Sequence, residues 1–107
     1  MKSPFPQATY AQNAEVYRLL ANPKRLEILN IIKHRERAVE DILKTVGISK
    51  ANLSQHLSLL RRAGLVKARR EGLRAYYRIT DPRLVEPCRI LHQLRARHAL
   101  LTQPTAV

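Results

Sequence analysis

A three-residue turn between two predicted helices constrains the fold of this 107-residue chain more than any other feature. Residues 37–46 carry apolar side chains at helical spacing, and Gly47 follows them. Glycine at that place permits the left-handed backbone that ends helices, and Ser49 is a good N-cap for the next helix. That helix stops at Gly64. Two helices joined so closely predict a helix-turn-helix.

Two further helices are predicted upstream of this turn. Apolar residues with a helical period begin at Ala8 and continue to Ala21. Asn22 and Pro23 then form a strong start signal, because Asn can accept a backbone N–H at the N-cap and proline suits the first helical position. The second helix is predicted to end near His34.

The pattern changes from helical to alternating after Gly64. Residues 65–80 read as two strands around a hairpin at Glu71 and Gly72, in which charged and apolar residues alternate. Arginines gather near the tip of this hairpin, which is typical of a wing. The predicted fold class is therefore mainly α with a small β-hairpin, a winged helix-turn-helix in the order α-α-α-α-β-β-α.

A final helix is predicted after the hairpin. Pro82 begins a short turn that reaches Glu86, and the main helix runs from Pro87 to about Leu101, because a proline inside a helical pattern breaks or restarts the helix. The predicted organisation is a flexible arm over residues 1–7, one DNA-binding and dimerisation domain over residues 8–101, and a flexible tail over residues 102–107.

Charge indicates the kind of partner. The chain has 20 Lys and Arg against 8 Asp and Glu, a formal net charge of +12, so its natural partners are polyanions. No apolar run is long enough to span a membrane, and the amino end lacks the apolar core of a secretory signal. A single cysteine, Cys88, suits a reducing compartment. We therefore expect a cytoplasmic protein that binds nucleic acid and no membrane.

The helix after the turn has an apolar side and a polar side. Leu53, Leu57 and Leu60 form one narrow stripe, and the opposite side is free. Arg and Lys can pair with guanine or phosphate, Gln can pair with adenine, and Ser can bind a phosphate or a base. The first turn also offers backbone N–H groups to phosphate. A solvated face is the alternative, but the tight turn, the basic hairpin and the net charge favour nucleic acid. The candidate DNA-binding residues of the helix are Ser49, Lys50, Asn52, Ser54, Gln55, His56, Ser58 and Arg62, and those of the wing are Arg69, Arg70 and Arg74.

One residue of this set has an ambiguous place. His56 adjoins the leucine stripe, so packing or phosphate bonding is as well supported as base reading.

The segments LLANPKRLEILNII and SKANLSQHLSLLRRAGLVKARREGLRAYYRI resemble the ArsR/SmtB family of bacterial winged helix-turn-helix repressors. The resemblance covers roughly residues 14–81. It implies a homodimer, built from the first and last helices, that binds an imperfect inverted repeat in an operator and leaves when an inducer arrives. It also assigns base recognition to the helix that begins at Lys50 and the wing to the hairpin from Arg69 to Arg74.

The residue pattern indicates a dimer independently. The first and last helices carry apolar stripes that a domain of this size need not bury alone; the alternative is that both stripes pack on the chain's own core. The candidate interface residues are Tyr10, Ala14, Tyr17, Leu91, Leu94, His98 and Leu101.

The family's known metal sites are not expected here. The positions that match its arsenic-type site hold Ala38, Val39 and Glu40, which lack the cysteines. Those that match its zinc-type site hold Asp81, Arg83, Leu94 and Arg97, of which only the aspartate could bind zinc. No metal or cofactor is therefore predicted.

Cys88 and His92 are the remaining candidate sensor, since they lie four residues apart on one helix face. Cys88 is a small core or interface residue, a redox-sensitive thiol, or a metal ligand completed by a second copy. A small molecule, a partner protein or the abundance of the protein itself are alternative signals, so the inducer stays unidentified.

Three function classes compete. No nucleophile and base set, phosphate loop or carboxylate pair indicates an enzyme. The leading prediction is a homodimeric transcriptional repressor at an inverted-repeat operator. The alternatives are a sequence-tolerant architectural or RNA-binding winged helix and a protein-interaction winged helix.

Overall fold

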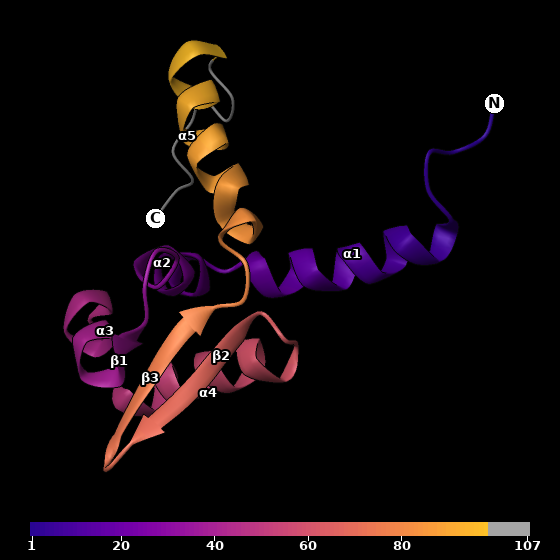
Figure 1. Ribbon diagram of the computed structural model, residues 1–107. Helices are drawn as coiled ribbons and strands as arrows, with labels where there is room; N and C mark the ends of the chain where they lie inside the picture. Colours follow the sequence, from indigo (N-terminus) through magenta and orange to yellow (C-terminus); the bar gives the residue numbers. More distant parts are fainter. Residues whose placement is uncertain (99–107) are drawn as a thin grey trace.

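The computed structural model describes residues 1–98, and their arrangement is a winged helix-turn-helix (Figure 1). The predicted fold class is confirmed. The elements of this part of the chain are α1 (Gln7–Leu20), α2 (Pro23–Ile31), β1 (Arg37–Ala38), α3 (Val39–Val46), α4 (Lys50–Arg62), β2 (Val66–Glu71), β3 (Arg74–Ile79), the 3-10 helix η1 (Pro82–Val85) and α5 (Glu86–His98). Leu101 and the predicted tail lie outside the described residues.

The start and stop signals read from the sequence are confirmed. The side chain of Asn22 accepts a hydrogen bond from the Arg25 backbone N–H at 3.0 Å, with Pro23 in the first turn of α2. Ser49 Oγ accepts one from the Asn52 backbone N–H at 3.1 Å, which caps α4. Between these helices Gly47 has φ 64°, the left-handed conformation that releases the chain from α3.

The predicted start of the third helix is wrong by two residues. Arg37 and Ala38 form β1, which pairs antiparallel with β3 opposite Tyr77 and Tyr76, and the sheet order is β1-β3-β2. The outer side of β3 offers unpaired backbone groups that a two-residue strand can satisfy, and this pairing holds Ala38 in an extended conformation. The helix can begin only at Val39.

Two other predicted boundaries shift. The second helix ends at Ile31 and not near His34. The last helix begins at Glu86, so Pro87 occupies its first turn, where its missing N–H breaks no helical hydrogen bond.

The core lies where α2, α3 and the leucine stripe of α4 meet the sheet. Five of its six largest fully buried side chains come from these three helices and the sixth, Ile32, caps α2, while Leu57 is only 2% exposed. Burial of a Leu or Ile side chain stabilises the fold by roughly 1.5–3 kcal/mol, so packing fixes which side of α4 faces outward. The six side chains are Ile28, Leu29, Ile32, Ile42, Leu53 and Leu60.

Helices α1 and α5 project away from this core (Figure 1). Neither contains a buried residue in residues 1–98, and only the last turns of α1 pack partly against the core, through Val16, Leu19 and Leu20. Within the described residues, no helix combines the length and the apolar character needed to cross a membrane.

Candidate nucleic-acid interface

The outward side of α4 is mostly polar, although Leu59 of this helix is 36% exposed. Lys50, Ser54 and Gln55 are exposed and Ser58 is half-buried, while Leu53 and Leu57 on the opposite side are buried. Asn52 and Arg62 are exposed at the two ends of the helix. Ser49 is exposed as well, although its hydroxyl oxygen is engaged in the N-cap.

A cleft of about 510 Å³ separates this surface from the wing, the hairpin of β2 and β3. We call it the helix–wing cleft. Its lining includes Val39, Leu43 and Tyr77 together with basic and hydroxyl side chains. The polar residues of the cleft are Glu40, Lys50, Ser54, Ser58, Arg61 and Arg70.

The three predicted wing arginines have different surroundings in the structure. Arg70 pairs with Ala75 across the hairpin and points to the side of the sheet that carries Val66 and Ile79, so its side chain lines the cleft. None of the ion pairs found within residues 1–98 involves Arg70. Its charge is therefore available to a ligand in the cleft.

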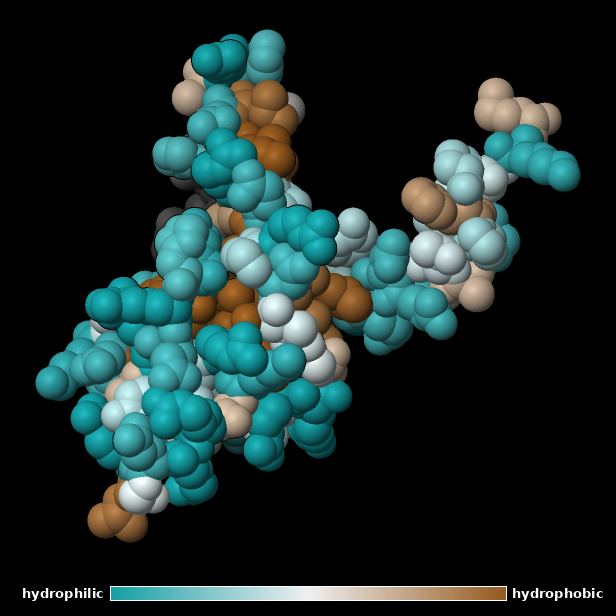
Figure 2. Space-filling model, viewed as in Figure 1, coloured by the Kyte–Doolittle hydropathy of each residue, from teal (hydrophilic) through white to brown (hydrophobic). Residues whose placement is uncertain are grey.

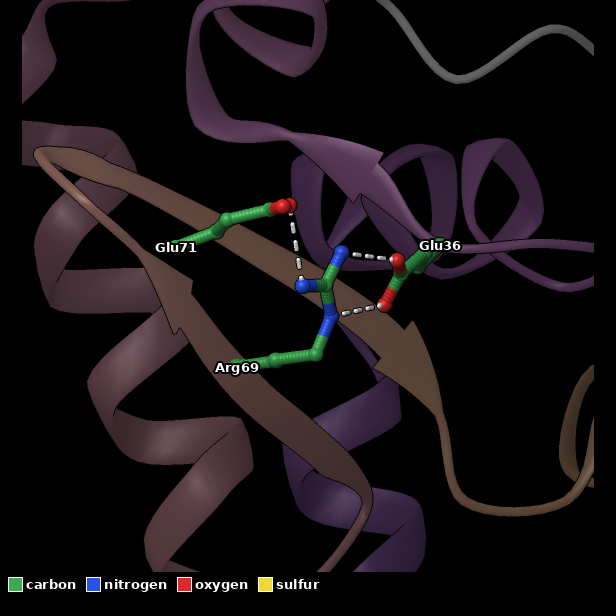
Figure 3. Close-up of polar contacts among 3 residues, drawn as sticks. All are labelled: Glu36, Arg69 and Glu71. Atoms are coloured by element: carbon green, nitrogen blue, oxygen red, sulfur yellow. Dashed lines mark hydrogen bonds and ion pairs between the residues drawn. The ribbon is translucent and has the colours of Figure 1, made fainter.

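Arg69 lies on the opposite side of the sheet and is engaged by two carboxylates (Figure 3). Its Nε donates to Glu36 Oε2 at 3.2 Å, its Nη2 donates to the other oxygen of Glu36, and its Nη1 donates to Glu71 Oε2 at 3.1 Å. The guanidinium also lies 4.6 Å from the ring centroid of Tyr76. Arg69 would have to leave these partners before it could bind a phosphate.

The charges of this cluster stabilise one another. The hydrogen bonds that Arg69 donates lower the pKa of Glu36, and the acceptance of those bonds by Glu36, with a smaller effect of Glu71, raises the pKa of Arg69. The ion pair joins residues 33 positions apart. It attaches the wing to the segment just before β1.

Arg74 occupies an intermediate position at the start of β3. Its Nε donates to Glu40 Oε1 at a long distance of 3.4 Å, and its guanidinium lies 5.6 Å from the Tyr76 ring. The pKa of Glu40 is lowered first by a hydrogen bond from its own backbone N–H, and then by Arg74 and Lys50. Sequence reasoning missed Glu40 as a cleft residue, although its place in the first turn after an extended segment is visible in the sequence.

His56 is connected to the helices behind α4. Its Nδ1 lies 3.4 Å from Arg25 Nη1, and Arg25 Nε donates to the Leu19 carbonyl at 2.5 Å. Burial lowers the pKa of His56, and the charge of Arg25 lowers it further. His56 therefore links α4 to α2 and to the end of α1.

The predicted interface residues of α1 are exposed. Tyr10 is 40% and Tyr17 65% exposed, and Ala14 between them is exposed too. Tyr10 also packs edge-on against Phe5 and accepts a hydrogen bond from Ser3 Oγ at 2.8 Å, contacts that the sequence did not reveal.

Helix α5 also carries exposed apolar residues. Leu91 is 47% exposed, Leu94 is half-buried and His98 is exposed, and Ile90, which was not among the candidate interface residues, is 40% exposed. Figure 2 shows this apolar surface along α5. Leu101 lies outside the described residues.

The candidate sensor and the zinc-type position differ in their surroundings. Cys88 is half-buried and His92 exposed on α5. Asp81 caps η1 by accepting from the Arg83 backbone N–H at 2.9 Å and forms an ion pair with the Arg83 guanidinium, whose hydrogen bond lowers the pKa of Asp81 to about 2. Across residues 1–98, no group of three or more His, Cys, Asp and Glu could hold a metal ion.

The fold and this basic surface define a winged helix-turn-helix DNA-binding domain. Residues 22–68 match the family described as "Bacterial regulatory protein, arsR family". The chain belongs to the ArsR family of bacterial transcriptional regulators. This is a non-enzymatic class, as the sequence predicted.

Relatives and solved structures agree with this assignment. The chain is 40% identical over 89 residues to Rv0081 of Mycobacterium tuberculosis, an uncharacterized HTH-type transcriptional regulator. The matched segment covers 82% of this chain and 78% of that protein. It is 37% identical over 86 residues to the probable mercury resistance operon repressor of Streptomyces lividans, and this match covers 80% of this chain and 69% of that protein. The homodimeric winged helix-turn-helix DNA-binding domain of Mb0332 from Mycobacterium bovis superposes with a TM-score of 0.75 at 38% identity, covering 91% of this chain and 93% of that one.

Proposed function

We propose that the protein is a homodimeric repressor that binds an inverted-repeat operator and leaves it when a signal arrives. The observation that carries this proposal is the outward polar side of α4, which lies across the helix–wing cleft from Arg70. An exposed helix of this width fits the major groove of B-DNA, and the wing then reaches the adjacent backbone or minor groove.

The residues of α4 divide into two roles. Lys50, Ser54, Gln55 and Ser58 face outward in the middle of the surface, so they read base edges, with Gln55 suited to adenine. The ends of the helix position it on phosphates, because the first turn presents backbone N–H groups and the last turn presents a guanidinium. The phosphate-binding residues are Ser49, Asn52 and Arg62.

The three arginines of the wing differ in how available they are to bind phosphate. Arg70 and Arg74 contact the backbone, Arg70 because no carboxylate engages it within residues 1–98 and Arg74 because its ion pair with Glu40 is long. Arg69 remains a weaker candidate for phosphate binding, since three of its nitrogens donate to carboxylates. His56 supports the helix from its inner edge.

The exposed apolar residues of α1 and α5 form the dimer interface in this proposal. A helix such as α1, with no buried residue and two exposed tyrosines, gains stability when a second copy covers it. The related DNA-binding domain of Mb0332 is homodimeric. A two-fold dimer places two copies of α4 about 34 Å apart, which matches an inverted repeat with half-sites one turn apart.

Selection from random duplex DNA followed by binding measurements tests this function. The selected sequences should contain an inverted repeat. Gln55→Ala should then relax preference at one base pair of each half-site, whereas Arg70→Ala should weaken binding to every sequence alike. Equal effects of both variants on all sequences would refute the base-reading role.

The competing function is sequence-tolerant binding of duplex DNA or RNA by charge alone. It predicts that no motif is selected and that binding is lost almost completely as salt rises. A protein-interaction role predicts that Arg70→Ala and Arg74→Ala leave function intact.

The releasing signal is a separate part of the proposal. Replacing Cys88 with Ser and measuring operator release under oxidant, zinc and copper tests the thiol. Release profiles identical to wild type would assign the signal to a small molecule, to a protein or to the abundance of the repressor.

A further inference from the structure

The tip of the wing carries a fully exposed apolar side chain. Leu73 is 100% exposed and follows Gly72 in a two-residue turn, with Glu71 and Arg74 paired across the hairpin on either side. Gly72 has φ 61°, and glycine first in such a turn is typical of tight hairpins. The turn thus needs a glycine, but nothing in its geometry requires a leucine beside it.

The dimer does not account for Leu73. Six of the seven other large apolar residues that are exposed within residues 1–98 belong to the amino-terminal segment, α1 or α5. The hairpin tip lies at the end of the molecule away from α1 and α5 (Figure 1), and Figure 2 shows a small hydrophobic protrusion there, bordered by hydrophilic surface. A contact made by Leu73 would therefore lie on a different side of the protein.

The DNA-facing side provides that contact. Leu73 lines the helix–wing cleft together with Lys50, Ser54 and Arg70. A duplex that places α4 in its major groove therefore presents its neighbouring minor groove to the hairpin tip. Arg70 and Arg74 lie within three residues of Leu73 and supply the cations that the narrow, negative minor groove attracts.

We propose that Leu73 is a minor-groove wedge that reads the deformability of the DNA next to each half-site. This inference rests on the proposed operator-binding function. Apolar side chains inserted between base steps unstack them and bend the duplex, and pyrimidine–purine steps such as TA unstack at least cost. Leu73 thereby favours operators with a flexible step at the place the wing tip reaches, without hydrogen bonding to any base.

The experiment uses the full chain and the inverted repeat selected by the wild-type protein. The step under the wing tip, located by footprinting, is made TA in one duplex and GC in another. Binding is measured by fluorescence anisotropy, and bending by energy transfer between dyes at the duplex ends. The variants are Leu73→Ser, the conservative Leu73→Met, and Arg74→Ala as a control for charge.

The wild-type protein and Leu73→Met should bind the TA duplex about 5-fold to 10-fold more tightly than the GC duplex and bend it. Leu73→Ser should lose the flank preference and the bend yet keep the half-site preference, and Arg74→Ala should weaken both duplexes alike. Melting temperatures within about 2 °C of wild type would show that each variant folds.

Three results overturn the wedge. A flank preference and bend that persist in Leu73→Ser would overturn it and leave the proposed function standing, as would a Leu73→Ser variant that changes only the oligomeric state. Failure of the wild-type protein to select any half-site would overturn the proposed function and the wedge with it.

Discussion

Arg25 Nη1 lies 3.4 Å from Nδ1 of His56, so a single guanidinium connects α4, the proposed DNA-binding helix, to α2. The same side chain donates from Nε to the carbonyl of Leu19, near the end of α1. Because α1 belongs to the proposed dimer interface, Arg25 lies between that interface and α4. Its substitution should therefore alter both folding stability and DNA binding.

Arg25→Met should lower the free energy of unfolding by about 1–2 kcal/mol, since it leaves the Leu19 carbonyl without its charged donor. DNA affinity should fall as α4 loses a support. Urea unfolding and anisotropy measure the two effects. Arg18→Met is the matched control, because Arg18 is exposed and its ion pair within residues 1–98 is with Glu15 on the same helix, and it should stay within about 0.5 kcal/mol of wild type.

The stability of the fold should fall as pH drops below the unfolded pKa of histidine, about 6.5. Burial and the charge of Arg25 lower the pKa of His56 in the folded state, so the folded state binds fewer protons than the unfolded state. The stabilisation is fully present above pH 6.5 and is lost as pH falls through the folded pKa. Urea unfolding between pH 7.5 and 5 should show a smaller decline for His56→Gln than for wild type; identical slopes would contradict this account.

Glu36→Gln should release Arg69 from its stronger carboxylate partner. The freed guanidinium can then bind a phosphate, which should raise affinity for all duplexes and steepen the dependence of log K on log salt by about 0.9. Glu15→Gln removes the same charge from α1, at a distance from the wing, and is the control. If both variants change the salt slope equally, the effect is one of net charge and not of Arg69.

Gly47→Ala should lower the free energy of unfolding by about 1–2 kcal/mol, because alanine is strained at φ 64°. A Cβ at this position would meet no atom within 4 Å, so the cost is one of backbone conformation alone. Urea denaturation measures it. Lys44→Ala, an exposed change in the same helix, should cost less than about 0.5 kcal/mol.

The parts of the fold that depend on neighbouring residues could be predicted from the sequence. Asn22 and Ser49 cap the helices that follow them, and Gly47 ends the helix before it, because each acts on backbone groups within four residues. The leucine stripe of α4 could be predicted equally well, since the helical period alone decides which side of the helix is buried.

Contacts between segments far apart in the chain could not be predicted from the sequence. β1 contains only Arg37 and Ala38, which are too few residues for an alternating pattern. It pairs with β3, a strand that lies about forty positions later in the chain. The ion pair of Glu36 with Arg69 likewise has no local signal. The wing arginines therefore looked equivalent in the sequence, whereas the sheet turns Arg69 and Arg70 to opposite sides.

The most direct test of the proposed function compares binding of the full chain to its selected inverted repeat and to a scrambled duplex of equal length and composition. At about 0.15 M salt, the proposed repressor should prefer the repeat by at least about 10³-fold and bind it as two protomers per duplex. A ratio near one at every salt concentration, or one protomer per site, would contradict it.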